Sequence, residues 1–144
     1  MDDVMRDPDF SMDIQISFGH CDPAGIVFYP NFFRWFDQCF HNFLRQRAGS
    51  HADLCKRLDA QGLGLMDAKA KFLSPATDGD VMTLELRFVE WGEKSFALDY
   101  HGRIGDRTVV RGTELRGMFV QRDGRMRAGE MAPLQAALSL EESA

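Results

Sequence analysis

The segment from Pro30 to Gly49 has the spacing of an amphipathic helix with an unusually broad apolar face. Its large apolar residues recur at the i, i+3, i+4 and i+7 positions that share one side of a helix. They are Phe32, Trp35, Phe36, Cys39, Phe40, Phe43 and Leu44. At about 100° per residue, Phe33 widens this apolar arc to roughly 180°, whereas roughly 100° suffices for a helix on a flat sheet. We therefore expect a sheet that curls around this helix.

Both ends of this helix carry residues that helices favour there. Proline is preferred at the first helical position because its missing N–H would be unpaired anyway, which suits Pro30. Gly49 is a typical terminator, and Arg45 and Arg47 lie in the last turn, where the helix dipole favours cations. A shorter second helix is expected at about residues 52–59.

The rest of the chain alternates between apolar and polar residues, which is typical of strands with one buried face. The expected strands are residues 11–18, 65–73, 81–91, 94–104 and 108–120, with a return through Met126. The pairs Gly92-Glu93, Gly105-Asp106 and Asp123-Gly124 suit short hairpin turns, which join antiparallel neighbours. The sequence therefore predicts an α+β fold with one long helix under an antiparallel sheet. The open edge of such a sheet invites a second copy, so we expect at least a dimer.

Length and composition indicate a single domain over residues 1–144. We expect residues 1–10 to be a loose tail and residues 131–144 to be a loose or short helical tail. No run approaches the roughly 18 apolar residues that a membrane span needs, and the acidic N-terminus lacks the apolar core of a signal peptide. Three cysteines without C-x-x-C spacing predict reduced thiols in the cytoplasm, not a disulfide framework or a zinc site.

The formal net charge of −5 argues against a general nucleic-acid-binding protein. The charge is uneven, because residues 87–127 hold nine Lys and Arg against six Asp and Glu, while the remainder carries a net charge of −8. A phosphate-bearing ligand would therefore be expected to meet the C-terminal half. The alternative is that these arginines simply solvate the outer face of the strands.

Asp22 lies between Cys21 and Pro23 in a turn-rich loop, residues 19–29, that leads into the long helix. An Asp-Pro pair is a common turn former, which is one sufficient explanation of this residue. A carboxylate on a rigid loop before a helix N-terminus is also suited to attack on a carbonyl group. Asp37, at the margin of the apolar arc, is either an ordinary boundary residue or a second functional acid.

Other candidates are weaker on chemical grounds. His20 and Cys21 are adjacent in the chain, so their side chains point apart, and no acid is evident that would orient the histidine. The glycines at positions 19, 25, 62 and 64 form neither a G-x-G-x-x-G motif nor a Walker loop between a strand and a helix, which disfavours a nucleotide-binding fold.

Residues 18–31, FGHCDPAGIVFYPN, followed by Arg34-Trp35-Phe36-Asp37, resemble the signature of the 4-hydroxybenzoyl-CoA thioesterase family of hotdog-fold proteins. The chain is most similar to the branch whose active-site loop reads C-D-P-A-G-I-V and continues with an aromatic residue, Tyr, Pro and Asn. Weaker similarity extends to residues 90–91, 94–96 and 125–128, and therefore to most of the chain.

This resemblance implies a hotdog fold, in which a five-stranded antiparallel sheet wraps a long helix. Two such units form a continuous ten-stranded sheet, with active sites at the dimer interface, and often assemble further into a homotetramer. The implied partner is a small-molecule acyl-CoA substrate, with neither nucleic acid nor membrane. No cofactor is implied, because coenzyme A is part of the substrate.

The resemblance also assigns residues. Asp22 matches the catalytic carboxylate, which attacks the thioester to give a mixed anhydride or activates water. The backbone N–H of Tyr29 matches the donor that polarises the thioester carbonyl, as the unpaired N–H groups and positive dipole of a helix start would also favour. Asp37 matches the residue that contacts the 4-hydroxyl group of the substrate across the interface, and Pro30 and Trp35 are expected beside the substrate.

Lys94 and Arg127 match positions that bind the CoA phosphates, and Arg125 is expected to join them. This chain has Gly92 and Glu93 where the relatives have two arginines. Other residues could therefore bind the CoA phosphates in this chain, and the candidates are Arg122, Arg125 and Arg116. His20 replaces an acidic residue beside the motif, which leaves the pKa of the neighbouring catalytic carboxyl open.

The expected function is hydrolysis of an acyl-CoA thioester, with an aromatic, 4-hydroxybenzoyl-like acyl group. One alternative is a broader thioesterase for short or medium acyl chains, like the relatives of the Tol-Pal system, which often carry a His near the helix start. A hydratase would need a histidine and a carboxylate in mutual reach, and His41, His51 and His101 lack an obvious partner. A non-catalytic acyl-CoA-binding hotdog module is the remaining alternative.

Overall fold

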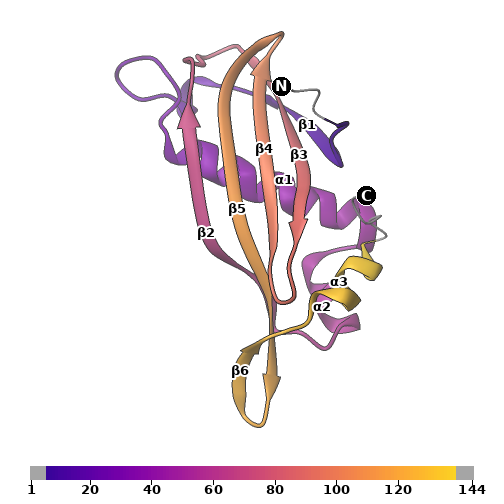
Figure 1. The fold of residues 1–144 in the computed structure, drawn as a ribbon. Coiled ribbons are helices and arrows are strands. Elements are labelled where there is room, and N and C mark those ends of the chain that lie inside the picture. Colours follow the sequence, from indigo (N-terminus) through magenta and orange to yellow (C-terminus); the bar gives the residue numbers. More distant parts are fainter. Residues whose placement is uncertain (1–5, 139–144) are drawn as a thin grey trace.

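Helix α1 (Pro30–Ala48) lies across one face of a curved antiparallel sheet in the computed structural model, which describes residues 6–138 (Figure 1). The prediction for this helix is confirmed at both ends. Pro30 is its first residue, and Gly49 follows the last turn with a φ of 89°, a conformation that favours glycine. The seven apolar residues of the predicted face are buried, whereas Phe33, which is expected to widen the arc, is only partly buried.

The sheet runs in the order β1-β3-β4-β5-β2, and the short strand β6 pairs with the end of β5. Every strand pairing is antiparallel. The strands are β1 (Phe10–Gln15), β2 (Gly62–Phe72), β3 (Val81–Trp91), β4 (Phe96–Ile104), β5 (Arg107–Arg122) and β6 (Arg125–Ala128). The predicted α+β architecture is therefore confirmed, with five strands around the helix and a sixth that extends one hairpin.

Two of the three predicted hairpin turns are confirmed. Gly105-Asp106 joins β4 to β5, and Asp123-Gly124, both with positive φ, joins β5 to β6. The connection of β3 to β4 is longer than the predicted Gly92-Glu93 pair. It spans four residues, because the Gly92 N–H donates to the carbonyl of Ser95 and closes a wider loop.

The core forms where α1 meets the inward-facing residues of the sheet. The rings of Phe36 and Tyr100 stack with their centroids 4.5 Å apart. Gly112 faces them, and a Cβ atom there would lie 2.4 Å from the Phe36 ring, so this approach requires glycine. Phe18, expected on the buried face of the first strand, is instead 81% exposed. The strand ends at Gln15, and the 3-10 turn that follows rotates Phe18 away from the core.

The smaller elements tie the remaining chain to this core. Helix α2 (His51–Arg57) follows α1 directly, and helix α3 (Met131–Ala137) buries Met131 and Leu134. Of the expected N-terminal tail, residues 6–10 contact β3, since the Arg87 side chain donates to the Arg6 carbonyl and Phe10 begins β1. Residues 1–5 and 139–144, the outer parts of both expected tails, lie outside the described residues.

Strand β2 is an edge of the sheet, paired with β5 alone. Large apolar side chains are exposed along it, namely Leu65, Met66 and Phe72. An exposed edge with apolar side chains can accept another strand. None of the helices in residues 6–138 has the length and apolarity needed to cross a bilayer.

Candidate active site

The Asp22 loop is a tight turn held by backbone hydrogen bonds. The Gly25 N–H donates to the Asp22 carbonyl at 2.8 Å, and the Ala24 N–H donates to Asp22 Oδ1 at 2.8 Å. This is an Asx-supported β-turn, with Pro23 at the position where proline is favoured. Asp22 Oδ2 accepts no hydrogen bond from any described residue. One carboxylate oxygen therefore fixes the turn, and the other is available for chemistry.

The same loop is also bound to the chain segment that connects β2 and β3. Cys21 and Val27 form an antiparallel bridge within the loop, and Ile26 forms another with Thr77. The Val27 N–H also donates to the carbonyl of Ala76 at 2.9 Å. These bonds hold the Asp22 turn against the segment between β2 and β3.

The start of α1 presents one unused N–H group. The Asn31 N–H donates to the Phe28 carbonyl at 3.0 Å, and the Phe32 N–H donates to the Tyr29 carbonyl at 3.1 Å. Pro30 has no N–H. The Tyr29 N–H donates to no acceptor in the described part of the chain. A free donor at the positive end of a helix is suited to stabilise a developing oxyanion.

Asp22 and Tyr29 line the same pocket, which has a volume of about 630 Å³. The other lining residues are Ile26, Val27, Phe32, Phe72, Leu73, Ser74, Pro75 and Ala76. Sequence reasoning found the first two residues but missed the wall from Phe72 to Ala76, which only the fold of the sheet brings to the loop. A carboxylate and an N–H donor at one apolar cavity suit attack on a carbonyl carbon.

Pro30 and Trp35, predicted beside the substrate, do not line this pocket. Trp35 is buried, and its ring meets those of His20 and Phe32 edge to face at 5.0 and 5.5 Å. Through its contact with His20, Trp35 packs against the loop that carries Asp22. His20 accepts a hydrogen bond from the Ser17 N–H through Nδ1, so it has a structural partner of its own.

Asp37 lies on α1 and is not part of this pocket. Its side chain is 58% exposed, and its Oδ1 accepts a hydrogen bond from Arg116 Nη2 at 3.1 Å. His41 Nε2 lies 3.6 Å from the same oxygen, so the expectation that His41 lacks a carboxylate partner is wrong. Burial, with the nearby charges of Arg116, His51 and Arg45, lowers the pKa of His41, although Asp37 opposes the shift.

Arg116 belongs to a buried polar chain between α1 and the sheet. Its Nε donates to Glu114 Oε1 at 2.9 Å, and the same oxygen accepts from the Tyr100 hydroxyl at 2.7 Å. Only 3% of the Arg116 side chain and 2% of the Glu114 side chain are exposed. Arg116 is therefore not a surface phosphate ligand, and that alternative is wrong. Burial and the negative charge of Glu114 raise the pKa of Tyr100 and raise that of Cys39 to about 12.

The predicted phosphate-binding residues gather at two neighbouring hairpins. Lys94, in the loop between β3 and β4, has its Nζ 3.9 Å from a Glu130 carboxylate oxygen. Arg125 and Arg127 lie on β6, are exposed, and form no ion pair with any residue from 6 to 138. The side chain of Arg122, at the start of the same hairpin, donates to the Gln121 carbonyl.

These hairpins lie at one end of the sheet, and the loop that leads into α1 lies at the other end (Figure 1). Phe72, at one end of β2, lines the pocket, whereas Gly62, at the other end, pairs with Phe119, which pairs with Ala128 of β6. Because β2 has 11 residues, the two ends are roughly 35 Å apart at about 3.3 Å per residue. One chain therefore does not bring Asp22 and the phosphate-binding candidates together.

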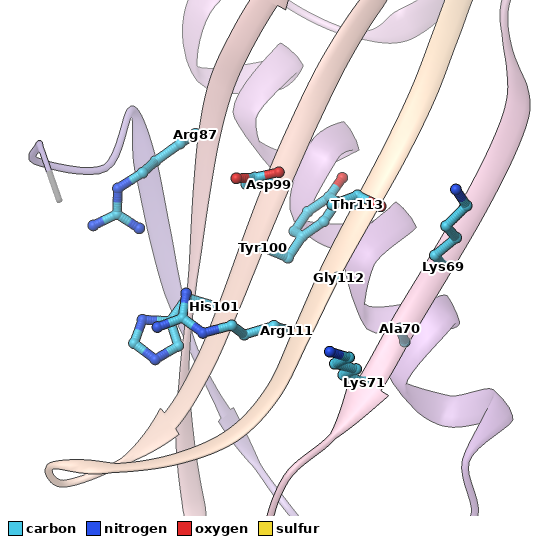
Figure 2. Close-up of a pocket in the computed structure, with 10 residues that line it drawn as sticks. All are labelled: Lys69, Ala70, Lys71, Arg87, Asp99, Tyr100, His101, Arg111, Gly112 and Thr113. Carbon is cyan, nitrogen blue, oxygen red and sulfur yellow. The ribbon is translucent and has the colours of Figure 1, made fainter. Parts of the chain in front are cut away.

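A second pocket, of about 410 Å³, lies on the face of the sheet away from α1 (Figure 2). Cations from several strands line it, including Lys69, Lys71 and Arg111. Arg87, at its margin, is already paired with Glu85 at 3.1 Å, and Glu85 also contacts Arg103 at 3.4 Å. Several arginines of the basic half thus occupy the outer face, as the alternative reading of the charge predicted. Within residues 6–138, no cluster of three or more His, Cys, Asp or Glu side chains could hold a metal ion.

Comparison with known proteins gives a consistent result. Residues 24–111 match the thioesterase superfamily. The 4-hydroxybenzoyl-CoA thioesterase of Pseudomonas sp. strain CBS-3 is 35% identical over 128 residues, which cover 84% of this chain and 90% of that protein. Its solved structure superposes with a TM-score of 0.77 and 31% identity over 89% of this chain and 96% of that one.

Two further structures are similar. An aspartate-to-asparagine mutant of 4-hydroxybenzoyl-CoA thioesterase, complexed with 4-hydroxybenzoyl-CoA, has a TM-score of 0.79 and 30% identity, covering 89% of this chain and 96% of that one. A gentisyl-coenzyme A thioesterase has a TM-score of 0.74 and 25% identity, covering 90% of this chain and 99% of that one.

Proposed function

Because this chain belongs to the thioesterase superfamily and is a hotdog-fold acyl-CoA thioester hydrolase, we propose that its substrates are hydroxylated aromatic acyl-CoA esters. The relatives named for 4-hydroxybenzoyl-CoA and gentisyl-CoA support an aromatic acyl group. The single observation that carries the proposal is that Asp22 and Tyr29 line one apolar pocket. The products would be a free aromatic acid and coenzyme A.

The proposed chemistry follows from the two groups at this pocket. The free oxygen of Asp22 attacks the thioester carbon, and the carbonyl oxygen takes up negative charge beside the Tyr29 N–H. Collapse expels the CoA thiolate and leaves a mixed anhydride, which water hydrolyses to regenerate the carboxylate. Alternatively, Asp22 removes a proton from the water that attacks. A single oxyanion donor of this kind typically lowers the barrier by roughly 2.7–4 kcal/mol.

Asp37 is proposed to recognise the hydroxyl group on the aromatic ring of the acyl group. Its Oδ2 accepts no hydrogen bond from the described residues, and the side chain reaches solvent. A carboxylate oxygen in this state can accept a hydrogen bond from a phenol. Since Asp37 does not line the pocket of its own chain, the proposal requires it to act on the substrate bound to a second copy.

We propose that a homodimer completes the site, with further assembly to a homotetramer. Antiparallel pairing of β2 with the β2 of a second copy would set the Phe72 end of one strand beside the Gly62 end of the other. Lys94, Arg125 and Arg127 of one copy would then lie near the Asp22 pocket of the other, where CoA phosphates could meet them. The exposed apolar side chains along this edge support such pairing.

The cysteines at 21, 39 and 55 are free thiols, which supports a cytoplasmic location.

A thiol-release assay with the purified wild-type protein tests the proposed substrate class. The panel contains 4-hydroxybenzoyl-CoA, gentisyl-CoA, benzoyl-CoA and a series of short and medium aliphatic CoA esters. We expect the highest kcat/KM with a hydroxylated aromatic ester. A maximum among the aliphatic esters would favour the broader thioesterase, and tight binding without thiol release would favour the binding module.

A mixing experiment tests whether two copies share each site. Asp22→Asn and Asp37→Ala proteins are prepared separately, then dissociated and reassembled together. Hybrid dimers should regain turnover of 4-hydroxybenzoyl-CoA, because one of their two sites contains both native acids. Each variant reassembled with itself is the control. Failure of the hybrids to regain turnover would show that both acids serve the site of one chain.

A further inference from the structure

A chain of polar side chains connects the buried centre of the protein to Asp37. The Tyr100 hydroxyl and Arg116 Nε both donate to Glu114 Oε1, and Arg116 Nη2 donates to Asp37 Oδ1. Tyr100 and Glu114 are almost fully buried, whereas more than half of the Asp37 side chain is exposed. This series of hydrogen-bonded side chains therefore begins in the core and ends at the surface.

This arrangement fixes the Arg116 guanidinium in one orientation. The group lies over the Phe40 ring, with its carbon 4.2 Å from the ring centroid, a contact that arginine makes favourably with aromatic faces. Glu114, two residues earlier on the same face of β5, accepts a hydrogen bond from Arg116 Nε. A planar guanidinium bound at Nε and stacked on a ring has little freedom left. A buried ion pair is weak evidence for stability on its own, so another role is worth testing.

Asp37 receives its orientation from this fixed group. An aspartate on an exposed helix face ordinarily samples several side-chain conformations, but one oxygen of Asp37 is held by Arg116 at 3.1 Å. His41 contacts the same oxygen at 3.6 Å. Oδ2 has no partner among residues 6–138, and 58% of the side chain is exposed.

We propose that Arg116, locked by Glu114 and Phe40, is the positioning residue that aims Asp37 at the hydroxyl group of the aromatic substrate. The inference rests on the proposed function, because Arg116 influences the substrate preference only through the contact of Asp37 with the substrate hydroxyl group. Arg116 does not touch the substrate. Its contribution is a pre-oriented acceptor, which raises the preference for hydroxylated over unsubstituted acyl groups.

The test removes the pair and compares it with a matched pair on the other face of the sheet. In the inner variant, Glu114→Gln with Arg116→Met, the amide oxygen can still accept from Tyr100 and the methionine can still cover Phe40. The control variant is Glu85→Gln with Arg87→Met. This pair has the same two-residue spacing on one strand and is also largely buried, with 13% and 9% of the side chains exposed.

The measured quantity is the ratio of kcat/KM for 4-hydroxybenzoyl-CoA to that for benzoyl-CoA. The inner variant should lower this ratio about tenfold, the size expected for a weakened hydrogen bond to a charged acceptor, with a much smaller loss on benzoyl-CoA. Adding Asp37→Ala to the inner variant should lower the ratio little further, because both changes remove the same interaction. The control variant should keep the wild-type ratio.

An unchanged ratio in a folded inner variant, or equal losses on both esters, would overturn the inference. If the double variant does not fold, Arg116→Lys replaces it, because lysine keeps the charge but loses the fork that reaches Glu114 and Asp37 together. The ratio should fall in this variant too, and an unchanged ratio would again overturn the inference. A wild-type protein without any hydroxyl preference would instead reject the proposed function itself.

Discussion

The two acids proposed for the site, Asp22 and Asp37, are positioned in opposite ways. The Asp22 side chain is held by one backbone N–H group of its own turn, that of Ala24, two residues away. Asp37 is held by a side chain 79 residues away, which is itself fixed by a buried carboxylate. The first acid is placed by local sequence and the second by tertiary packing. This difference teaches that substitutions in the core should disturb the position of Asp22 less than the position of Asp37.

The largest expected effect is that of Asp22→Asn. The amide oxygen can still accept from Ala24, so the turn and the fold should remain, while the nucleophile or base is lost. We expect kcat to fall by about 10²–10⁴-fold, and by the same factor for hydroxylated and unsubstituted esters. Thiol release by both esters, with circular dichroism to verify the fold, measures this. A variant that keeps wild-type turnover would remove Asp22 from the mechanism.

Asp37→Ala should have a smaller and selective effect. A lost hydrogen bond to a charged acceptor is worth about 1.5–3 kcal/mol, so kcat/KM for 4-hydroxybenzoyl-CoA should fall by roughly 10- to 100-fold. The value for benzoyl-CoA should change much less, because that ester has no hydroxyl group to read. Steady-state kinetics with the two esters checks this, and equal losses would show that Asp37 does not distinguish them.

Gly25→Ala tests whether the backbone of the turn positions Asp22. Gly25 has a φ of 85° and open space around its Cβ position, so the substitution strains the backbone without a side-chain clash. We expect a stability loss of roughly 1–2 kcal/mol and equal rate losses on both esters. Gly105→Ala is the matched control, with a φ of 60° and the same open space. The Gly105→Ala protein should lose stability but keep its rate of thiol release. If the rate falls in Gly105→Ala as much as in Gly25→Ala, the account is contradicted.

The smallest expected effect concerns His41, which shares an oxygen of Asp37 with Arg116. Its pKa is lowered, mainly by burial, so the unfolded chain binds a proton at higher pH than the folded chain does. The free energy of unfolding should therefore decrease as the pH falls below about 6.5. His41→Asn should make this dependence shallower in urea unfolding between pH 7.5 and pH 5. A steeper dependence would mean that His41 is charged and held by Asp37.

The parts of this molecule that could be predicted are those that depend on neighbouring residues. The limits of α1, the turns at Gly105-Asp106 and Asp123-Gly124, and the order of helix and strands follow from local spacing and turn chemistry. The Asp22 turn is predictable in the same way, because its chemistry is local, whereas the role of the Tyr29 N–H is what the resemblance to the thioesterase family implies. Phe18 was misassigned because alternation continued past the residue where the strand ends.

The environment of Asp37 could not be predicted, because it depends on the register of β5 against the helix. Counting charge gave one basic half, but the fold divides its arginines among three places. Arg116 is in the core, Arg87 is on the outer face of the sheet, and Arg125 and Arg127 are on an exposed hairpin. A one-residue change of register would exchange the inward and outward positions, and sequence spacing alone does not determine that register.

The most direct test of the central claim is a crystal structure of the Asp22→Asn variant with 4-hydroxybenzoyl-CoA bound. The account predicts that the thioester oxygen lies about 2.7–3.2 Å from the Tyr29 N–H nitrogen, beside the substituted residue at position 22. It also predicts that the 4-hydroxyl group meets the partner subunit's Asp37. A thioester bound away from the start of α1, for example in the outer-face pocket, would contradict it.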